Sequence, residues 1–344
     1  MEVRVDQSLV VTQFGFDDVR WKDFVARYHR ANPFHSPEVS HVFAVSKGFK
    51  VIPLFACAGE DVVACAIAVL VSISDGWSRR LTNRLIVYAS PLYANTPEGT
   101  QGMERILSEL RTLARKNALF LEIRNSEPFP PQGELNGLRG SEYIPYQNYI
   151  VDLSAGADHL WESYNSFTRN HIRKSEKKGA VLREIVPGEI GTVIDLIVGL
   201  YTRKKIPVLN PDVFASAYRM LTPSGMLRTM VLEVEGKIVA TRLSLNYLQT
   251  VYDWYAASDP GYAKYYPNEA LTWNTIRWGA EQGYKIFDFG GGAVRGEDYG
   301  PAKFKEKFMG QLVEYGRYRY APYPMLYRAA RTVYEMRRRG VKGP

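Results

Sequence analysis

The stretch MVLEVEGKIVATRL at residues 230–243 has an earlier counterpart, VIPLFACAGEDVVACAI, at residues 51–67. Each consists of two apolar runs joined by a two-residue link that begins with glycine, at Gly59 and Gly236. Glycine at the first position of such a link is typical of a β-hairpin with a type II′ turn. We therefore expect the same hairpin once in each half of the chain.

Each half then continues with a helix and a strand. The predicted helix–strand pairs are 101–117 with 119–124 and 268–282 with 285–289. The two strands carry an acid at an equivalent place, Glu122 in the first and Asp288 in the second. One order of elements occurring twice predicts an α/β (α+β) protein of two related domains, each with a mixed sheet flanked by helices.

The composition fits a globular protein of this size. Of the 344 residues, 46% are hydrophobic and 23% charged, so the chain can bury a sizeable core. We place the two domains at 1–150 and 151–322, followed by a helical tail at 323–344. Two cysteines are too few for a disulfide framework, and the longest apolar run is shorter than the ~20 residues of a membrane span. The N-terminus also lacks a signal-peptide pattern, so we expect a cytoplasmic protein.

The net charge of +8 belongs to the second half of the chain. The first 150 residues hold equal numbers of acidic and basic side chains, so residues 151–344 carry the whole excess. If 161–179 is one helix, Arg169, Arg173 and Lys177 form a basic stripe along one face. The expected partners are therefore anionic: a phosphate-bearing substrate, RNA or a lipid surface.

Several catalytic signatures are missing from the sequence. The five histidines are scattered and have no cysteine partners, so no metal site is expected. The chain has no G-x-S-x-G elbow, and the triplet Gly290-Gly291-Gly292 lacks the spacing of a nucleotide-binding loop. The triplet suits a tight turn or a close approach to a ligand. These absences favour group transfer by positioning of the reactants.

Polar and aromatic side chains gather in two segments of the second half. On a regular strand through YDWY at 252–255, Asp253 and Tyr255 share one face, which predicts a ligand-facing side. If GPAKFKEKFMG at 300–310 is extended, Lys305 points away from Phe304.

Five short motifs resemble the Fem-type (FemAB-like) proteins, in the same order. They are TRNHIRKSEKKG (168–179), WYAAS (254–258), YYPN (265–268), IFDFGG (286–291) and FKEKFMG (304–310), and PFHSPE (33–38) is similar to the start of the family's first domain. The resemblance implies a pair of GNAT-type acyltransferase domains. Well-known members transfer an amino acid from aminoacyl-tRNA to an amine of a peptidoglycan precursor. The long coiled-coil arm of some members is missing here, as no paired heptads occur.

The resemblance also implies roles for particular residues. Lys305 matches the family lysine at the reacting centre, where it would stabilise the oxyanion, and Asp253 or Asp288 could accept the amine proton. Arg173 and Arg203 would bind phosphates of a substrate. The remaining residues expected to contact the substrate are Tyr255, Asn268 and Phe304.

The expected reaction is attack of a primary amine on an activated acyl or aminoacyl ester, with a cell-wall precursor or surface glycan as acceptor and no cofactor. Aminoacyl-tRNA is the favoured donor, because the Q/R-x-x-G-x-G/A loop that grips coenzyme A in ordinary GNAT enzymes is absent. The alternatives are an acyl-CoA-dependent N-acyltransferase of surface polysaccharide, a non-catalytic module for an anionic ligand, and a nonspecific RNA binder. The sequence does not indicate an oligomeric state.

The tail at 323–344 has the pattern of a membrane-surface helix. Leu326, Ala330 and Val333 fall at i, i+4 and i+7, and basic residues including Arg338 and Arg339 lie mostly off that stripe. We therefore expect the tail to contact anionic lipid headgroups at the inner membrane surface.

Overall fold

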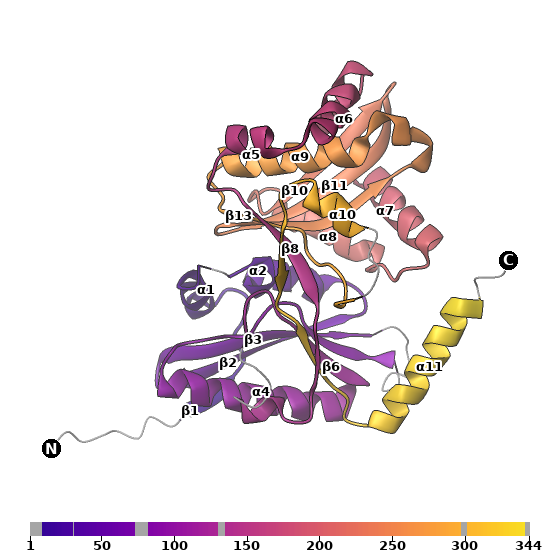
Figure 1. Ribbon diagram of the computed structural model, residues 1–344. Helices are drawn as coiled ribbons and strands as arrows, with labels where there is room; N and C mark the ends of the chain where they lie inside the picture. The colour runs from indigo at the N-terminus through magenta and orange to yellow at the C-terminus, as the bar shows by residue number, and fades with distance from the viewer. Residues whose placement is uncertain (1–8, 30, 73–81, 130–134, 297–300, 341–344) are drawn as a thin grey trace. The chain divides into compact units, whose positions relative to one another are not determined.

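The computed structural model describes residues 9–29, 31–72, 82–129, 135–296 and 301–340 (Figure 1). Residues 1–8 of the predicted first domain and 341–344 of the predicted tail lie outside this part, as do the side chains of Arg338 and Arg339. The chain divides into two compact units. The first comprises 1–28, 34–145 and 315–344, and the second comprises 29–33 and 146–314.

The first unit packs helices on a mixed sheet. Its elements are β1 (Leu9–Thr12), α1 (Val19–Ala26), α2 (Pro37–Val45), β2 (Phe49–Ala58), β3 (Asp61–Val71), β4 (Arg84–Val87), β5 (Leu92–Tyr93), α4 (Pro97–Asn117), β6 (Phe120–Arg124), β7 (Glu142–Ile144), β15 (Arg317–Tyr320) and α11 (Pro324–Gly340). Helix α4 begins at a Thr96 cap and buries Met103, Ile106 and Leu110 against one face of this sheet. The spacing of these residues, three and four apart, places them on one side of the helix.

The second unit has helices on both faces of its sheet (Figure 1). Its elements are β8 (Gln147–Asp152), α5 (Ala157–Ser163), α6 (Ser166–Lys177), β9 (Val181–Glu184), α7 (Ile190–Lys204), α8 (Pro211–Leu221), β10 (Leu227–Val234), β11 (Lys237–Tyr247), β12 (Thr250–Ser258), α9 (Pro267–Glu281), β13 (Ile286–Asp288), α10 (Pro301–Glu306) and β14 (Gln311–Glu314). Helix α9 buries Ala270 and Leu271 against residues of β10 and β11, while α7 packs on β11 and β12.

The two sheets repeat one strand order. The first runs β1-β2-β3-β4-β6-β15-β7, and the second, read in the same sense, runs β9-β10-β11-β12-β13-β8-β14. In each sheet the fourth and fifth strands are parallel, β4 with β6 and β12 with β13, and the other pairs along this order are antiparallel. The predicted fold class, two related α/β domains with mixed sheets, is therefore confirmed.

The strand beside β6 comes from the end of the chain. Strand β15 pairs with β6 and β7, so residues 317–320 belong to the first sheet and not to the second domain predicted at 151–322. At the same position of the second sheet, β8 comes from the segment that joins the units, and it starts before the predicted boundary at 150. The strand exchange joins segments far apart in sequence, which a reading of local patterns does not detect. Helix α11 likewise belongs to the first unit.

The two hairpins differ in their turns. Between β2 and β3, Gly59 has a φ of +64°, as the first position of a type II′ turn requires. Between β10 and β11, Glu235 and Gly236 have φ values of +51° and +77°, and two left-handed residues define a type I′ turn. The type II′ prediction at Gly236 is therefore wrong by one residue, because the glycine holds the second turn position.

The helix predicted over 161–179 is interrupted. Helix α5 ends before the buried Tyr164, and Asn165 then caps α6, accepting a hydrogen bond of 2.8 Å from the Thr168 amide. The side chain of Arg169 donates at 2.8 Å to the Glu162 carbonyl at the end of α5. The predicted basic stripe is therefore partly used to join the two helices.

Candidate functional site

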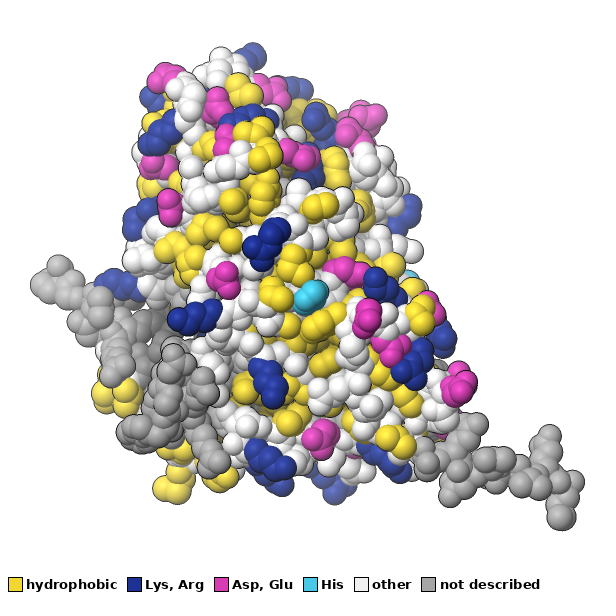
Figure 2. Space-filling model, turned by 180° about the vertical axis from the view of Figure 1, so that it is seen from behind, with side chains coloured by type: hydrophobic (Ala, Val, Ile, Leu, Met, Phe, Trp, Pro, Cys, Tyr) yellow, Lys and Arg dark blue, Asp and Glu magenta, His cyan; other side chains and the backbone are white. Residues whose placement is uncertain are grey.

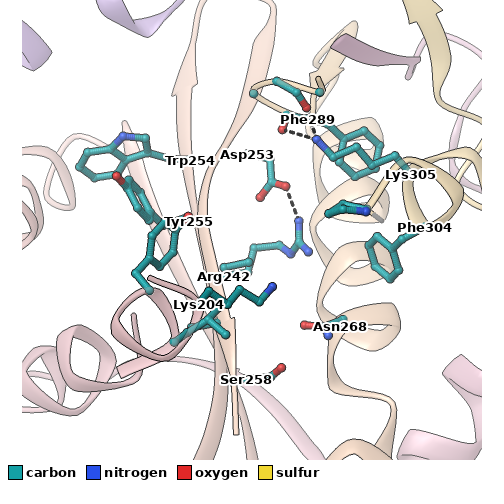
Figure 3. Close-up of a pocket in the computed structure, with 18 of the residues that line it drawn as sticks. Lys204, Arg242, Asp253, Trp254, Tyr255, Ser258, Asn268, Phe289, Phe304 and Lys305 are labelled. Carbon is teal, nitrogen blue, oxygen red and sulfur yellow. Dashed lines mark hydrogen bonds and ion pairs between the residues drawn. The ribbon is translucent and has the colours of Figure 1, made fainter. Parts of the chain in front are cut away.

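The second unit contains a pocket of about 660 Å³ (Figure 3). The described residues that line it are Tyr146, Leu200, Tyr201, Lys204, Arg242, Asp253, Trp254, Tyr255, Ala256, Ala257, Ser258, Asn268, Phe289, Gly290, Gly291, Gly292, Pro301, Phe304 and Lys305. They come from β11, β12, the loop after β13, the C-terminal end of α7, the first turn of α9, and α10. The pocket therefore draws on four of the five segments that resemble Fem-type motifs in the second half.

The pocket opens where two parallel strands part. Strand β13 pairs with β12 over only three residues, from Thr250–Ile286 to Tyr252–Asp288. Beyond Tyr252, β12 continues to Ser258 in pairing with β11, while the chain leaves β13 through the glycine triplet. A sheet that separates in this way leaves room between its strands for an extended substrate.

A β-bulge at Trp254 redirects the side chains of β12. The pairing passes from Leu243–Tyr255 to Ser244–Asp253, so Trp254 is the extra residue. Because paired residues share a face and neighbours on β11 point to opposite faces, Asp253 and Tyr255 point to opposite sides. Figure 3 shows Asp253 directed to Arg242 and Tyr255 turned toward α7. The prediction that Asp253 and Tyr255 share one face is therefore wrong.

The glycine triplet makes the tight turn that its composition predicts. Gly290 and Gly291 have φ values of +72° and +143°, and a Cβ at Gly290 would lie 2.7 Å from the Asp253 carbonyl oxygen. The Tyr252 hydroxyl donates at 3.2 Å to the Gly290 carbonyl, and the Gly291 amide donates at 2.8 Å to Oδ1 of Asn148. Glycine is needed here for both its backbone conformation and its lack of a side chain.

Lys305 extends from the short helix α10 to the glycine triplet. Its ammonium group donates to the Phe289 carbonyl at 3.2 Å and to the Gly291 carbonyl, and only 8% of the residue is exposed. Burial lowers the pKa of Lys305 to about 8, although the carboxylates of Asp253 and Asp288 favour its charged form. Lys305 is therefore mostly protonated at pH 7. The expectation that 300–310 is extended is wrong, since 301–306 is helical.

Two acids face this lysine in different environments. Asp288 is buried at the end of β13, where its Oδ1 accepts hydrogen bonds of 2.7 Å from Nδ2 of Asn148 and from the Gly290 amide. Burial raises the pKa of Asp288 in spite of these bonds. Asp253 lines the pocket, and its Oδ2 receives a hydrogen bond of 2.6 Å from Nη1 of Arg242. Its buried Oδ1 has no partner among the described residues.

The family model matches within the second unit. Residues 166–305 match the model of an acetyltransferase (GNAT) domain. Over 170 residues the chain is 25% identical to the UDP-N-acetylmuramoylpentapeptide-lysine N(6)-alanyltransferase of Weissella viridescens, an alignment that covers 48% of this chain and 49% of that protein. The crystal structure of FemX matches with a TM-score of 0.70 at 13% identity, over 93% of this chain and 99% of FemX. The chain therefore resembles the FemAB-like proteins, with a match to a GNAT acetyltransferase domain over residues 166–305.

Two further solved structures share the fold of this chain. One is a tandem GNAT protein of the clavulanic acid pathway, with a TM-score of 0.58, 11% identity, and coverage of 92% and 99%. The other is the C-terminal domain of a putative lysylphosphatidylglycerol synthetase from Agrobacterium fabrum, with a TM-score of 0.56, 14% identity, and coverage of 92% and 95%. The sequence resemblance to the Fem-type proteins is thus confirmed, and the chain spans about half the length of the curated relative that it matches.

The pocket brings together most of the residues singled out in the sequence. Lys305, Asp253, Tyr255, Asn268 and Phe304 line the pocket, whereas the buried Asp288 is not part of its lining. The two predicted phosphate ligands stand apart from the described lining. The exposed Arg173 has its guanidinium 5.3 Å from the centre of the Trp161 ring, and Arg203 is exposed on α7. Their roles remain predictions.

Sequence reasoning missed two basic residues of the pocket. Lys204, next to Arg203, lines the pocket from the last turn of α7. Arg242 lies inside the apolar strand β11 and is only 4% exposed. A charged residue in the middle of an apolar strand needs a buried partner, and this rule could have linked Arg242 to Asp253.

The described residues contain neither a membrane-spanning helix nor a cluster of metal-binding side chains. In this part of the chain, no helix is both long and apolar enough to cross a bilayer. Nor do three His, Cys, Asp or Glu side chains come together there in an arrangement that could hold a metal ion.

Proposed function

We propose that this protein transfers an aminoacyl group from an aminoacyl-tRNA to a primary amine of a peptidoglycan precursor. The amine nitrogen bonds to the ester carbonyl carbon and the ester C–O bond breaks. The ribose hydroxyl of the donor leaves with a proton that the amine gives up. The reaction needs aligned reactants, a neutral amine, and stabilisation of the tetrahedral oxyanion.

The position of Lys305 is the observation that carries this proposal. A protonated amine is held at the pocket wall by two backbone carbonyls, in surroundings that exclude most water. A preorganised cation in such a place stabilises a developing oxyanion more strongly than it would in water. Since its pKa is about 8, Lys305 keeps this charge at neutral pH.

Asp253 favours an aminoacyl donor over a plain acyl donor. One oxygen of this carboxylate is neutralised by Arg242, and the buried Oδ1 has no partner within the described part of the chain. The α-ammonium of an aminoacyl ester would be attracted to this carboxylate at the pocket wall, whereas an acetyl group carries no charge for it to pair with. An acyl-CoA-dependent N-acyltransferase is therefore the second candidate. Asp253 also stays a candidate, with Asp288, for accepting the proton of the attacking amine.

The acceptor is proposed from the relative. The alanyltransferase of Weissella viridescens is named for the lysine N6 of UDP-N-acetylmuramoylpentapeptide, a primary amine on a phosphate-bearing molecule. Lys204 at the pocket and Arg203 beside it offer positive charge for such phosphates, as does Arg173 on α6. We keep the prediction that the enzyme is cytoplasmic and acts near the inner membrane surface.

A reconstituted assay tests the proposal. The purified chain is mixed with charged total tRNA and UDP-N-acetylmuramoylpentapeptide, and the peptide is analysed by mass spectrometry. We expect the mass of one amino acid to be added by the wild type and not by Lys305→Met, with Lys303→Met as the matched control on the same helix. Addition of an acyl group from acyl-CoA alone would identify the second candidate. Ligand binding without turnover in either assay would favour a non-catalytic module.

A further inference from the structure

Helix α11 presents two different faces. On one, the Tyr327 hydroxyl accepts a hydrogen bond of 2.9 Å from Nη1 of Arg319, and the Tyr327 ring meets the edge of Phe120 with centroids 5.6 Å apart. Ala330, three residues further along, is half-buried on the same side. Tyr327 therefore anchors the helix to strands β6 and β15 of the first unit.

The other face is apolar and exposed. Met325, Val333 and Met336 are 85%, 49% and 64% exposed, and Leu326 beside them is 40% exposed. At 100° per residue, Met325, Val333 and Met336 fall within one quarter of the helix circumference, away from Tyr327. In Figure 2, hydrophobic side chains stand out at the lower left, where α11 lies in this reversed view. The stripe predicted through Ala330 is therefore corrected to one through Met325, Val333 and Met336.

The charge of this segment selects the partner. Arg328 is exposed beside the apolar stripe, while Arg331 is exposed nearer the Tyr327 side of the helix. The sequence adds three consecutive arginines at 337–339, and Glu335 is the single acid between 323 and 344. An exposed aliphatic stripe flanked by arginines complements a lipid surface, which has an apolar interior beneath anionic headgroups. RNA would satisfy the arginines but not the methionines and valine.

We propose that α11 is an interfacial helix that docks the protein on an anionic lipid bilayer. The Met325–Met336 stripe enters the boundary between headgroups and acyl chains, and the arginines contact anionic headgroups. Lys/Arg residues near such a surface contribute about 1 kcal/mol each, which corresponds to about fivefold in binding for each residue. The proposal does not depend on the transferase reaction.

Vesicle co-sedimentation of the full chain tests this proposal without any substrate. Phosphatidylcholine vesicles are compared with vesicles that also contain phosphatidylglycerol, at physiological salt. We expect the wild type to bind the anionic vesicles and not the neutral ones. The double variant Met325→Ser/Met336→Ser should bind at least tenfold more weakly, and Arg328→Gln about fivefold more weakly. The matched control is Val181→Ser/Val186→Ser, which removes two other exposed apolar side chains, each 53% exposed, and should bind like the wild type.

Three outcomes would overturn the proposal. One is equal binding of the wild type and the Met325→Ser/Met336→Ser variant, because the apolar stripe would then have no part in docking. Another is that RNA releases the wild type from the vesicles while the double variant binds them as tightly as the wild type. This pair of results would indicate a surface that binds polyanions in general. The third is a wild-type dimer in sedimentation velocity that the double variant abolishes, since the stripe would then bind a second copy. Thermal melts of all variants exclude misfolding as the cause.

Discussion

Replacing Lys305 by methionine should change how the stability of the second unit depends on pH. In the folded protein the pKa of Lys305 is about 8, whereas the ordinary value is 10.5. A lysine whose pKa is lowered by folding destabilises the folded state below the folded pKa, because its charged form is then buried. This cost disappears as the pH rises from about 8 to 10.5, since the unfolded chain binds more protons throughout that window.

The size of the effect follows from the two pKa values. The whole difference corresponds to about 3 kcal/mol, at 1.36 kcal/mol for each pH unit. Between about pH 7.5 and about pH 9.5 the linkage relation gives a gain of about 2 kcal/mol in the free energy of unfolding. Methionine has a similar length and no charge, so Lys305→Met should lack this gain. Buried tyrosines such as Tyr201, whose pKa burial raises to about 12, act in the opposite direction, but mainly above pH 10.

Urea denaturation of the wild type and Lys305→Met at the two pH values measures this difference. Tryptophan fluorescence reports mainly on the second unit, which holds four of the six tryptophans, namely Trp161, Trp254, Trp273 and Trp278. The wild type should gain about 2 kcal/mol relative to the variant on going from about pH 7.5 to about pH 9.5. Lys303→Met, at an exposed position of the same helix, should behave like the wild type. If wild type and Lys305→Met changed in parallel, Lys305 would not be a buried cation, and the argument for oxyanion stabilisation would lose its basis.

Four further changes have definite expected outcomes. Lys305→Ala should lower kcat roughly 10²–10³-fold. The wild-type rate should fall as the pH rises above about 8, where Lys305 loses its charge. Stopped assays of both proteins across this pH range measure the two effects. Arg173→Ala and Arg203→Ala should raise KM for the phosphate-bearing substrate at nearly unchanged kcat, and a fall in kcat at unchanged KM would contradict a binding role. Gly290→Ala should destabilise the protein by more than about 1 kcal/mol, because the added Cβ would meet the Asp253 carbonyl oxygen and the residue has a φ of +72°. Urea titration measures the free energy of unfolding, and an unchanged value would contradict the described turn. Glu122→Gln should lower the free energy of unfolding at pH 7. It should also weaken the loss of stability as the pH falls from about 4.5 to about 2, the window between the unfolded and folded pKa values of Glu122. Acid titrations of stability that are equal for both proteins would be inconsistent with the pairing of Glu122 with arginines.

The sequence predicts the fold better than the site, for physical reasons that particular residues illustrate. Hairpins, helices and the acid-bearing strands depend on local periodicity, and the repeated order of elements reveals the duplication. The bulge at Trp254 depends on pairing with β11. The sequence of β12 alone therefore does not indicate that Asp253 and Tyr255 point to opposite faces of the sheet. Lys305 and Asp253 could be found through their motifs, but Arg242 becomes visible only when its buried partner is considered.

The two related units have diverged at one equivalent acid. In the first, Glu122 on β6 contacts Arg124, Arg317 and Arg319, which hold its pKa near 2 despite burial, so this carboxylate is fully neutralised by neighbouring side chains. In the second, Asp288 on β13 has a raised pKa and faces a single lysine, beside a pocket with an acid oxygen still unpartnered among the described residues. Groups whose charge is satisfied internally serve structure, whereas perturbed and incompletely paired groups beside a cavity are typical of chemistry. This difference supports the proposal that the transfer reaction takes place in the second unit, and it favours a structural role for the acid of the first.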